Sequence, residues 1–543
     1  MKPSTSFDNV LELIRRTSTV LPPDVTSVLD LHAALETPGT SADLALKLVA
    51  ENIALARGRS APICQDTGTI SFYVKTPPGF DQIEFEEVCN AAVVEATKLG
   101  FLRQNSVDSV TGHNSGNNLG PGSPVFHWHQ HGGATVDVRL ILKGGGCENM
   151  SAQYSLPATI NGKRADRDLD GVFACVIDAV WQAQGKGCGP GFLGVCIGGD
   201  RASGYDFAKH QLLRTCDDTN PDPKLAELEA HVMDAANQLN IGPMGFGGKL
   251  TVGACKVGAL NRLPASFFLT VAYMCWAYRR RGVVLDAKSG DVRDWLYQSP
   301  GEFDKPFEEP ANKGLVALGS KSGSTARIVK LKTPLTEADV RGLKAGDIVL
   351  LSGVVFTGRD AVHQYLYKGG DLDVLHNSVI YHCGPVVLEE RIPATDLGLP
   401  NQDTAAGATQ DTAPLKLNGA QMRYKIVAAG PTTSIREEPY QDEVIKRFGV
   451  KAVIGKGGMG AKTLAACKEH GCVYLHAIGG AAQIYARCVE NVPNVYLKQF
   501  GSPEAVWEMH VKDFPAVVTM DSHGRSLHAE VADDSKARLA GVS

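Results

Sequence analysis

Three of the 13 cysteines stand in loops that differ from an ordinary hydrophobic core. Cys64 lies in APICQDTGT, directly before Gln65 and Asp66, Cys188 lies in GKGCGPGFLG, and Cys275 lies in SFFLTVAYMCWAYRRR. Their wide separation excludes a compact ferredoxin-type run. Distant single cysteines can instead converge as three thiolate ligands of a four-iron cubane, whose fourth iron stays open as a Lewis acid. Three buried structural thiols are the commoner outcome, and the spacing alone leaves both interpretations open.

A second set of reactive side chains consists of cations in glycine- and threonine-rich loops. Arg359 lies in FTGRDAVH, Arg436 in AGPTTSIREEP and Lys456 in VIGKGGMGAK. Each follows an apolar, strand-like run and precedes a predicted helix, so we expect the three to converge at one edge of a sheet. Arginine binds a carboxylate through two hydrogen bonds and lysine adds a point charge, which together suit a dianion. Most of the 54 lysines and arginines are expected to be solvated surface groups.

Two glycine-rich stretches resemble nucleotide-binding loops without fulfilling the pattern. GGMGAKT (457–463) follows a predicted strand, but Ala461 stands where a P-loop requires glycine. The glycines around Cys188 nearly make a dinucleotide fingerprint, but Phe192 occupies the third glycine position. Neither stretch predicts a nucleotide site.

Three histidines alternate in VFHWHQHGG and would share one face of a strand: His127, His129 and His131. They could bind zinc, but a polar strand face or a hairpin end is the favoured interpretation.

The elements that must position these loops change in character along the chain. Residues 6–58 have apolar residues at helical spacing, and mixed strands and helices continue to about 300. After a Gly-, Pro- and Ser-rich stretch, strand, Gly/Thr loop and helix alternate, as in an α/β domain. We therefore predict an α/β and α+β protein with two domains. The expected bounds are a helix-rich mixed N-terminal domain at 1–305, a linker at 306–325, a smaller α/β C-terminal domain at 326–531, and a disordered polar tail at 532–543.

Composition limits the classes of function. The formal net charge is −5, so no general basic field attracts nucleic acid or an anionic membrane. The longest uncharged apolar run, 265–278, is too short to cross a bilayer and predicts a buried element. The N-terminus carries Asp8 and Glu12 and is not a signal peptide. We expect a cytoplasmic protein that acts on a small molecule.

Several of these segments, taken in order, resemble the class I fumarate hydratases, the iron–sulfur type with both domains on one chain. The matching segments span nearly the whole chain: PICQDTGT, LRQNSVDSVTGHNSGNN, LKGGGCEN, the Cys188 loop with CIGGDRA, GRDAVH, GPTTSIR, IGKGG and YLHAIGGAA. The same framework is found in L-tartrate dehydratase and related two-subunit hydro-lyases. The resemblance therefore indicates the chemistry more strongly than the substrate.

The resemblance implies a role for each candidate residue. The cluster ligands of a [4Fe-4S] cluster would be Cys64, Cys188 and Cys275, and the catalytic residues would be Thr432, as base, and Asp66, as our preferred proton relay. The substrate contacts would be Gln65, Arg103, Gly145, Gly146, Arg359, Arg436 and Lys456. Relatives are homodimers, which implies a homodimer here.

One departure from the family pattern concerns a histidine. The family has a His-Gly pair between Arg-Leu-Pro and the third cysteine, whereas here Pro264 runs directly into Ala265. The histidine, which belongs to the active site in relatives, is deleted, and its role is unassigned.

The resulting expectation is reversible hydration of fumarate to (S)-malate, with the open iron as Lewis acid. Two alternatives stay open: an L-tartrate or mesaconate hydro-lyase, and an iron- or redox-sensing cluster protein. The set of carboxylate-binding cations argues against a pure sensor, because a sensor needs no substrate site.

Overall fold

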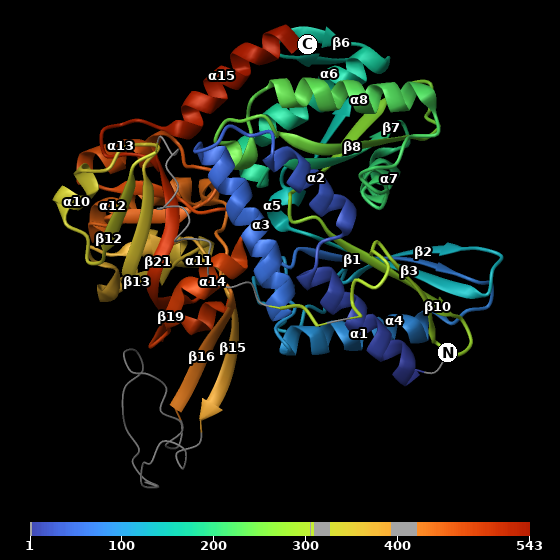
Figure 1. Ribbon diagram of the computed structural model, residues 1–543, viewed down its shortest axis with the longest axis horizontal. Helices are drawn as coiled ribbons and strands as arrows, with labels where there is room; N and C mark the ends of the chain where they lie inside the picture. Colours follow the sequence, from blue (N-terminus) through green and yellow to red (C-terminus); the bar gives the residue numbers. More distant parts are fainter. Residues whose placement is uncertain (1–2, 305, 309–325, 393–420, 543) are drawn as a thin grey trace.

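The computed structural model describes residues 3–304, 306–308, 326–392 and 421–542, which form two neighbouring parts (Figure 1). Except for residues 306–308, the predicted linker lies outside the described residues. No helix in the described ranges is both long and apolar enough to cross a membrane.

One layer of the N-terminal part is a five-stranded sheet with the order β11-β10-β3-β1-β2. Its strands are β1 (Thr69–Thr76), β2 (Val125–Gln130), β3 (Thr135–Lys143), β10 (Arg279–Asp286) and β11 (Val292–Leu296). Every second residue of β3 from Val136 to Leu142 is fully buried, because alternate strand residues point to one face. Helices α1 (Pro3–Thr19) and α4 (Gln82–Lys98) supply the apolar side chains that pack with this strand in one core.

A four-stranded sheet with the order β4-β9-β7-β8 forms the second layer. Its strands are β4 (Ala152–Ser155), β7 (Gly191–Ile197), β8 (Val252–Ala259) and β9 (Phe268–Met274). On one face α6 (Leu169–Ala183) and α8 (Pro223–Gln238) pack against Leu193 and Val195, while α7 (Arg201–Gln211) packs on the opposite face with Phe192. The predicted buried element is confirmed for residues 267–278, which include β9 in the interior of this sheet, whereas Ala265 is exposed.

The N-terminal part contains further helices, a hairpin and turns. They are α2 (Pro23–Ala33), α3 (Ser41–Arg59), α5 (Gly145–Glu148), the hairpin β5 (Ala158–Ile160) and β6 (Lys163–Ala165), and the 3₁₀ turns η1 (Gln184–Gly187) and η2 (Pro243–Gly245). The predicted helical region 6–58 is confirmed as α1, α2 and α3. Thr40 caps α3 by accepting from the backbone N–H of Asp43, which satisfies one of the free N–H groups at the start of the helix.

The C-terminal sheet closes into a small barrel, whereas the predicted alternation of strand, loop and helix did not specify whether the sheet is open or closed. The strands run β12-β13-β14-β17-β18-β21-β19, and the additional pairing of β13 with β21 closes the ring. Their bounds are β12 (Ile328–Lys332), β13 (Ile348–Thr357), β14 (Val379–Tyr381), β17 (Ala452–Gly455), β18 (Val473–His476), β19 (Val489–Asn491), β20 (Val495–Tyr496) and β21 (Val506–Met520). The closing strand β21 pairs antiparallel with β13, so the barrel combines parallel and antiparallel neighbours.

Helices surround the barrel, and a two-stranded ribbon projects from it (Figure 1). The helices and turns are α10 (Glu337–Arg341), α11 (Asp360–Tyr367), α12 (Glu438–Phe448), α13 (Ala461–His470), α14 (Ala482–Cys488), η3 (Asp373–Leu375), η5 (Ser434–Glu437) and η6 (Lys498–Phe500). The ribbon consists of β15 (Val386–Ile392) and β16 (Gln421–Ala428). The strand before the GPTT loop therefore belongs to the ribbon, although Thr433 still bridges to Lys456 beside β17.

Residues 532–542 of the tail are not disordered as predicted, because residues 527–542 form the helix α15 (Leu527–Val542). It extends from the C-terminal part across to α6 and α8 of the N-terminal part (Figure 1). Leu539 joins their apolar core, and Ser535 accepts a hydrogen bond from the Gln184 side chain at 3.0 Å. A few buried residues on one side are enough to dock a helix whose sequence is largely polar.

Candidate active site

The three predicted cluster cysteines are brought to one place from separate segments. Cys64 lies between α3 and β1, Cys188 between η1 and β7, and Cys275 at the end of β9. All three are at most 7% exposed. Cys188 has a φ of +54°, which is uncommon for a residue other than glycine and marks a backbone held by its surroundings.

A fourth thiol, Cys147 of α5, belongs to the same cluster of side chains and was not among the predicted ligands. Its hydrogen bond to Cys275 lowers the pKa of Cys147 to about 7, and the same hydrogen bond together with burial raises the pKa of Cys275. This pair therefore gives up one proton readily and holds the second. The motif LKGGGCEN offered a signal, because glycines crowd Cys147 as they crowd Cys188.

Lys456 joins the thiols to the C-terminal part. Its Nζ donates to Cys188 Sγ at 2.8 Å. Burial alone would lower the pKa of Lys456, but Cys188, Cys64 and Cys275 raise it when they are thiolates, so this side chain stays cationic beside them. A Cβ at Gly479 would lie 2.4 Å from Cys188 Sγ, so only glycine permits this close approach.

Asp66 lies at the centre of the predicted cations. Its Oδ2 accepts from Gly145 N at 2.9 Å, and its Oδ1 accepts from Arg103 Nη2 at 3.2 Å. Burial raises the pKa of Asp66, but Arg103, Lys456, Arg279 and Arg359 outweigh burial and lower it to about 2. Asp66 is therefore a carboxylate at neutral pH.

Arg103 and Arg359 meet at one loop although they come from different parts of the chain. Arg103 Nη1 donates to the carbonyl of Gly384 at 2.8 Å. Arg359 Nη2 pairs with Glu504 Oε1 at 3.1 Å, and its Nη1 would lie 2.5 Å from a Cβ at Gly384. The two guanidinium groups thus flank a position where no side chain fits.

The other predicted substrate contacts, except Arg436, also lie where the N-terminal and C-terminal parts meet. Gln65 Nε2 donates to Pro431 O at 3.2 Å, directly before Thr432, which is 8% exposed. Gly146 faces Lys456, whose Nζ lies 3.6 Å from the position of a Cβ there. Arg436 is different: its side chain is 37% exposed, and its Nη2 pairs with Asp360 at 2.8 Å at the margin of the site.

The nucleotide-loop resemblances have structural explanations. The start of α13 is already occupied by the carboxylate of Glu438, which accepts from the backbone N–H groups of Gly460, Lys462 and Thr463. An internal anion thus takes the place where a phosphate would bind. Phe192 is buried within β7, and the glycines precede a strand rather than a helix.

The three histidines do not share a strand face. His131 lies beyond β2, and its Nε2 is 2.9 Å from the carbonyl of Thr135, at the start of β3. His127 Nδ1 contacts Asp206 at 2.8 Å. These contacts favour a polar strand face over a zinc site, whereas the hairpin end is wrong, because β1 lies between β2 and β3 in the sheet.

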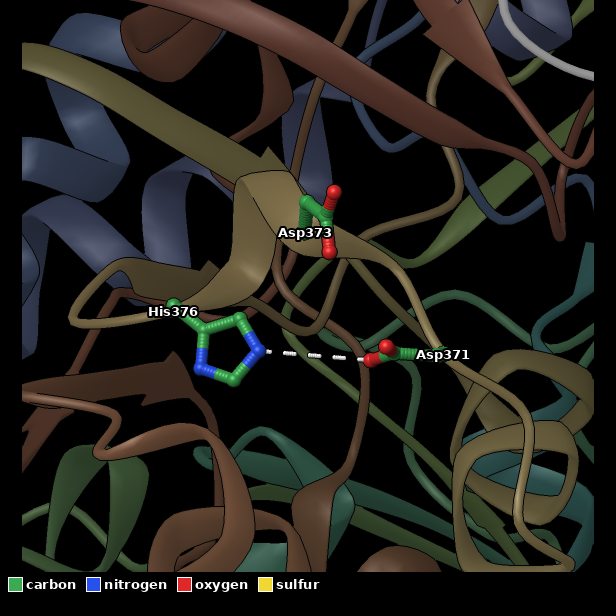
Figure 2. Close-up of side chains that lie close together, drawn as sticks. All are labelled: Asp371, Asp373 and His376. Carbon is green, nitrogen blue, oxygen red and sulfur yellow. Dashed lines mark ion pairs between the residues drawn. The ribbon is translucent and has the colours of Figure 1, made fainter.

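Within the described chain, one set of three metal-ligating side chains has all its donor atoms within 4.8 Å of one another: Asp371, Asp373 and His376 (Figure 2). All three are exposed, and Asp371 also lies 3.9 Å from Arg447 Nη2. Exposed acidic groups commonly gather without an ion, so this set does not mark a functional site.

The chemistry of the four thiols fits a cluster better than a single ion. Sulfur ligands of one tetrahedral zinc ion lie about 4 Å apart, because Zn–S bonds measure about 2.3 Å. No three of the four thiols form a set that compact in the part of the chain that the structure describes. A cubane instead binds its thiolates at different corners, which allows wider spacing.

The shortened loop at Pro264 lies away from the thiols. It precedes β9 (Phe268–Met274), whereas Cys275 follows the same strand. Seven extended residues span roughly 23 Å at about 3.3 Å per residue. The segment that lacks the family histidine therefore does not line the thiol cluster of its own chain.

Comparisons with known proteins give one consistent result. Residues 7–284 match the family described as fumarate hydratase (fumerase), and residues 301–406 and 414–531 match the family described as fumarase C-terminus. A Geobacillus stearothermophilus protein provisionally named class I fumarate hydratase is 49% identical over 535 residues, which cover 98% of each chain.

Two-subunit proteins match separate portions. The Methanocaldococcus jannaschii protein provisionally named L(+)-tartrate dehydratase subunit alpha is 31% identical over 52% of this chain and 98% of its own length. The Escherichia coli L(+)-tartrate dehydratase subunit beta is 32% identical over 37% of this chain and 86% of its own length.

Proposed function

Because the chain belongs to the class I fumarate hydratase family and carries both family domains on one polypeptide, we propose that it hydrates fumarate reversibly to (S)-malate at the interface of those domains. Members of this family are hydro-lyases, and the chain is one of them. We retain 1–305 and 326–531 as the proposed domain bounds, with a linker between them. By resemblance we also propose a homodimer.

The observation that carries the proposal is the position of Lys456. Its ammonium contacts the thiol of Cys188 and also faces the backbone of Gly146. A cation that could bind a substrate carboxylate thus stands directly beside the candidate cluster ligands. A structural thiol core would have no need of a buried lysine, whose desolvation costs several kcal/mol unless the charge is paired.

The donor set fits a [4Fe-4S] cluster held by Cys64, Cys188 and Cys275. When bound, such a cluster supplies a Lewis acid at the one iron that lacks a protein thiolate. Cys147 stands beside Cys275 and is not assigned as a ligand, because the three-thiolate set already leaves one iron open.

The cations bind and orient the dicarboxylate. Arg103 and Arg359 both lie against Gly384, and Lys456, directly after β17, lies beside Gly146. In a site largely closed to water, these fixed charges also stabilise the additional negative charge that develops as the C3 proton leaves malate. Arg436, at the margin, would close on the substrate by exchanging Asp360 for a carboxylate.

The proton is transferred by Thr432 and Asp66 in our proposal. A threonine Oγ1 is a poor base by itself, and the surrounding cations would have to activate it. Asp66, with a pKa of about 2, is also a weak base in the free enzyme. A bound dianion would compete for Arg103, Arg359 and Lys456, and would therefore raise the pKa of Asp66 toward the range of a useful relay.

One alternative substrate has its own support, because two-subunit relatives are named L(+)-tartrate dehydratase. Protein reconstituted anaerobically with iron and sulfide should be assayed with fumarate, L-tartrate and mesaconate. We expect kcat/KM for fumarate to exceed the other two at least about tenfold, a difference of about 1.4 kcal/mol in transition-state binding. A preference for L-tartrate would mean that L-tartrate, and not fumarate, is the substrate, and that the enzyme is still a hydro-lyase.

A further inference from the structure

A chain of buried polar side chains lies beneath the loops that carry the substrate cations. Its members are His363 of α11, Gln441 of α12, His382 after β14, Ser434 of η5 and Tyr474 of β18, and none of them is exposed to solvent. His363 Nε2 and His382 Nε2 both lie 2.9 Å from the same atom of the Gln441 amide. His382 Nδ1 lies 2.7 Å from Ser434 Oγ, which also accepts from the Tyr474 hydroxyl at 2.8 Å.

This chain contacts the backbone of each substrate loop. His363 Nδ1 lies 3.0 Å from the carbonyl of Arg359. The carbonyl of His382 accepts from Thr432 N at 2.6 Å, and Ser434 N donates to the carbonyl of Lys456 at 3.1 Å. Lys456 N in turn donates to the carbonyl of Thr432 at 3.1 Å. Three loops that are far apart in sequence are thus held through one buried network.

The protonation of the network follows from its acceptors. Nδ1 of His363 faces a carbonyl, so it must carry the proton, and Nε2 of the neutral ring is then an acceptor. The shared partner must therefore be the NH₂ group of Gln441, which can donate one hydrogen to each ring. With the amide oxygen in that position, Gln441 Nε2 has no partner in the described part of the chain. Turning the amide by 180° gives both N–H hydrogens an acceptor and leaves the oxygen, which is less costly to leave unpaired, in the position without a partner.

We propose that Gln441 is a positioning residue, whose amide holds His363 and His382 so that the Arg359, Thr432 and Lys456 loops keep the spacing that a dicarboxylate requires. This assignment rests on the proposed function, since it concerns the same site. Gln441 itself touches neither substrate nor thiols. It acts because a buried donor shared by two rings fixes both of them, whereas loops held by backbone contacts alone could drift apart.

The charges around the two rings favour neutral histidines. Burial, and then the neighbouring His363 ring, lower the pKa of His382 well below its usual value, and Arg436 and Arg359 lower it further. Burial likewise lowers the pKa of His363, against smaller opposing effects of the hydrogen bonds to the Arg359 carbonyl and to Gln441, and of the Asp360 charge.

The first test compares Gln441→Leu with Gln364→Leu, the same substitution at an exposed position of neighbouring α11. Gln441→Leu should raise KM for fumarate about tenfold and change kcat much less, because it loosens binding in both ground and transition states. Iron content and visible absorbance should stay at the wild-type level. Gln364→Leu should match the wild type in all respects.

The second variant, Gln441→Glu, tests the donor role at nearly constant shape. A carboxylate cannot donate to either ring, so one ring or the carboxyl group must take up an extra proton. The KM ratio of Gln441→Glu to wild type should therefore fall as the pH is lowered from about 8 to about 6. A role in packing alone would leave this ratio independent of pH, and that result would overturn the proposal even if Gln441→Leu failed to fold.

Hydrogen exchange separates this proposal from the proposed function. Without substrate, amides of segments 430–436 and 455–458 should exchange faster in Gln441→Leu than in Gln364→Leu. Unchanged exchange in both segments overturns the positioning role, whatever the activity. Absence of fumarate hydration by the wild type would refute the function alone, because the exchange measurement needs no substrate.

Discussion

At the scale of single residues, the cysteines divide into those that gather at the interface and those that fill cores. Cys64, Cys188 and Cys275 share the surroundings of Lys456, whereas Cys89 lies within the apolar core between α4 and the first sheet. Residue type cannot distinguish these two groups, because a reduced cysteine also packs well as a small apolar side chain. The distinction comes from neighbouring charge.

The first prediction concerns the ligand set. Cys275→Ser should abolish the stable cluster, because a serine hydroxyl is a poor iron ligand at neutral pH. Cys147→Ser should retain the iron, since Cys147 is the neighbour of a ligand and not a ligand itself. Iron content and visible absorbance after anaerobic reconstitution measure both effects. Cys89→Ser serves as the control. If Cys147→Ser lost its iron while Cys275→Ser retained it, Cys147 would be the ligand and Cys275 its neighbour.

A second prediction concerns Glu437, a fully buried carboxyl group. Burial and then Asp360 raise its pKa from 4.5 to about 8. The folded protein therefore holds a proton that the unfolded chain releases near pH 4.5. This contribution to stability is complete below about pH 4.5 and is lost as the pH rises toward 8, by about 1.4 kcal/mol per pH unit.

Glu437→Gln should consequently raise the Tm relative to wild type, and the gain should be larger at pH 8 than at pH 6. Thermal unfolding at both pH values measures it. Glu443→Gln, an exposed change on α12, should give the same Tm difference at both. Equal gains at pH 6 and pH 8 for Glu437→Gln would mean that the carboxyl group does not titrate in this range.

Cys147 and Arg436 are two residues whose side-chain contacts could not be predicted from the sequence pattern. The glycine-rich motif around Cys147 was visible in the sequence, but its contact with Cys275 depends on how α5 docks against β9. Arg436 stands in a loop that does reach the site, yet its guanidinium pairs with Asp360 at the margin. Loop position can be predicted from strand and turn signals, whereas side-chain direction depends on tertiary neighbours.

At the scale of elements, the strands and loops could be predicted and the barrel could not. The runs that form β13, β17 and β18 have an apolar pattern that a local window detects. Closure depends on the pairing of β13 with β21, in which Ile348 lies opposite Val517. No local sequence pattern predicts a pairing between two strands that are so far apart in the sequence. Helix α15 was missed because the burial of Leu539 depends on its packing with α6 and α8, which no local pattern shows.

The third prediction concerns the start of α13. Glu438 accepts from three backbone N–H groups there and from the hydroxyl of Thr463 at 2.6 Å. Glu438→Ala should lower the free energy of unfolding by about 1–2 kcal/mol, as expected for loss of a helix cap. Denaturant unfolding measures this change. Lys462→Ala, at an exposed position of the same helix, should alter neither stability nor fumarate hydration, and binding of ATP by the wild type would contradict this interpretation of the loop.

At the scale of the whole molecule, the candidate active site depends on the meeting of the two parts. Asp66 and the thiols come from the N-terminal part, while Arg359, Thr432 and Lys456 come from the C-terminal part. Several buried hydrogen bonds hold this interface, including Trp276 Nε1 to Gly479 O at 2.7 Å. Rigid docking of the parts is therefore a condition for the geometry of the site, and the ligand-binding interface is also a stability interface.

Asn52 of α3 connects the interface between the two parts to the segment before Cys64, a candidate cluster ligand. Its Oδ1 accepts from Gln483 N at 2.8 Å and Ile484 N at 3.3 Å on α14, and its Nδ2 donates to the carbonyl of Ile63 at 3.0 Å. Ile63 directly precedes Cys64. Because Asn52 is fully buried, water cannot replace these contacts in the folded protein.

The last prediction is that Asn52→Ala weakens both the interface and the hold on iron. Each buried backbone group left unpaired costs about 1–3 kcal/mol, so the Tm of the reconstituted protein should fall by several degrees. Because the segment before Cys64 is also released, iron should be lost to a chelator faster under anaerobic conditions. Lys47→Ala, at an exposed position of the same helix, removes only a surface ion pair with Asp43 and should change neither quantity. A lower Tm with an unchanged rate of iron loss would mean that the docking of α3 on α14 and the setting of Cys64 are independent, and that Asn52 serves the interface alone.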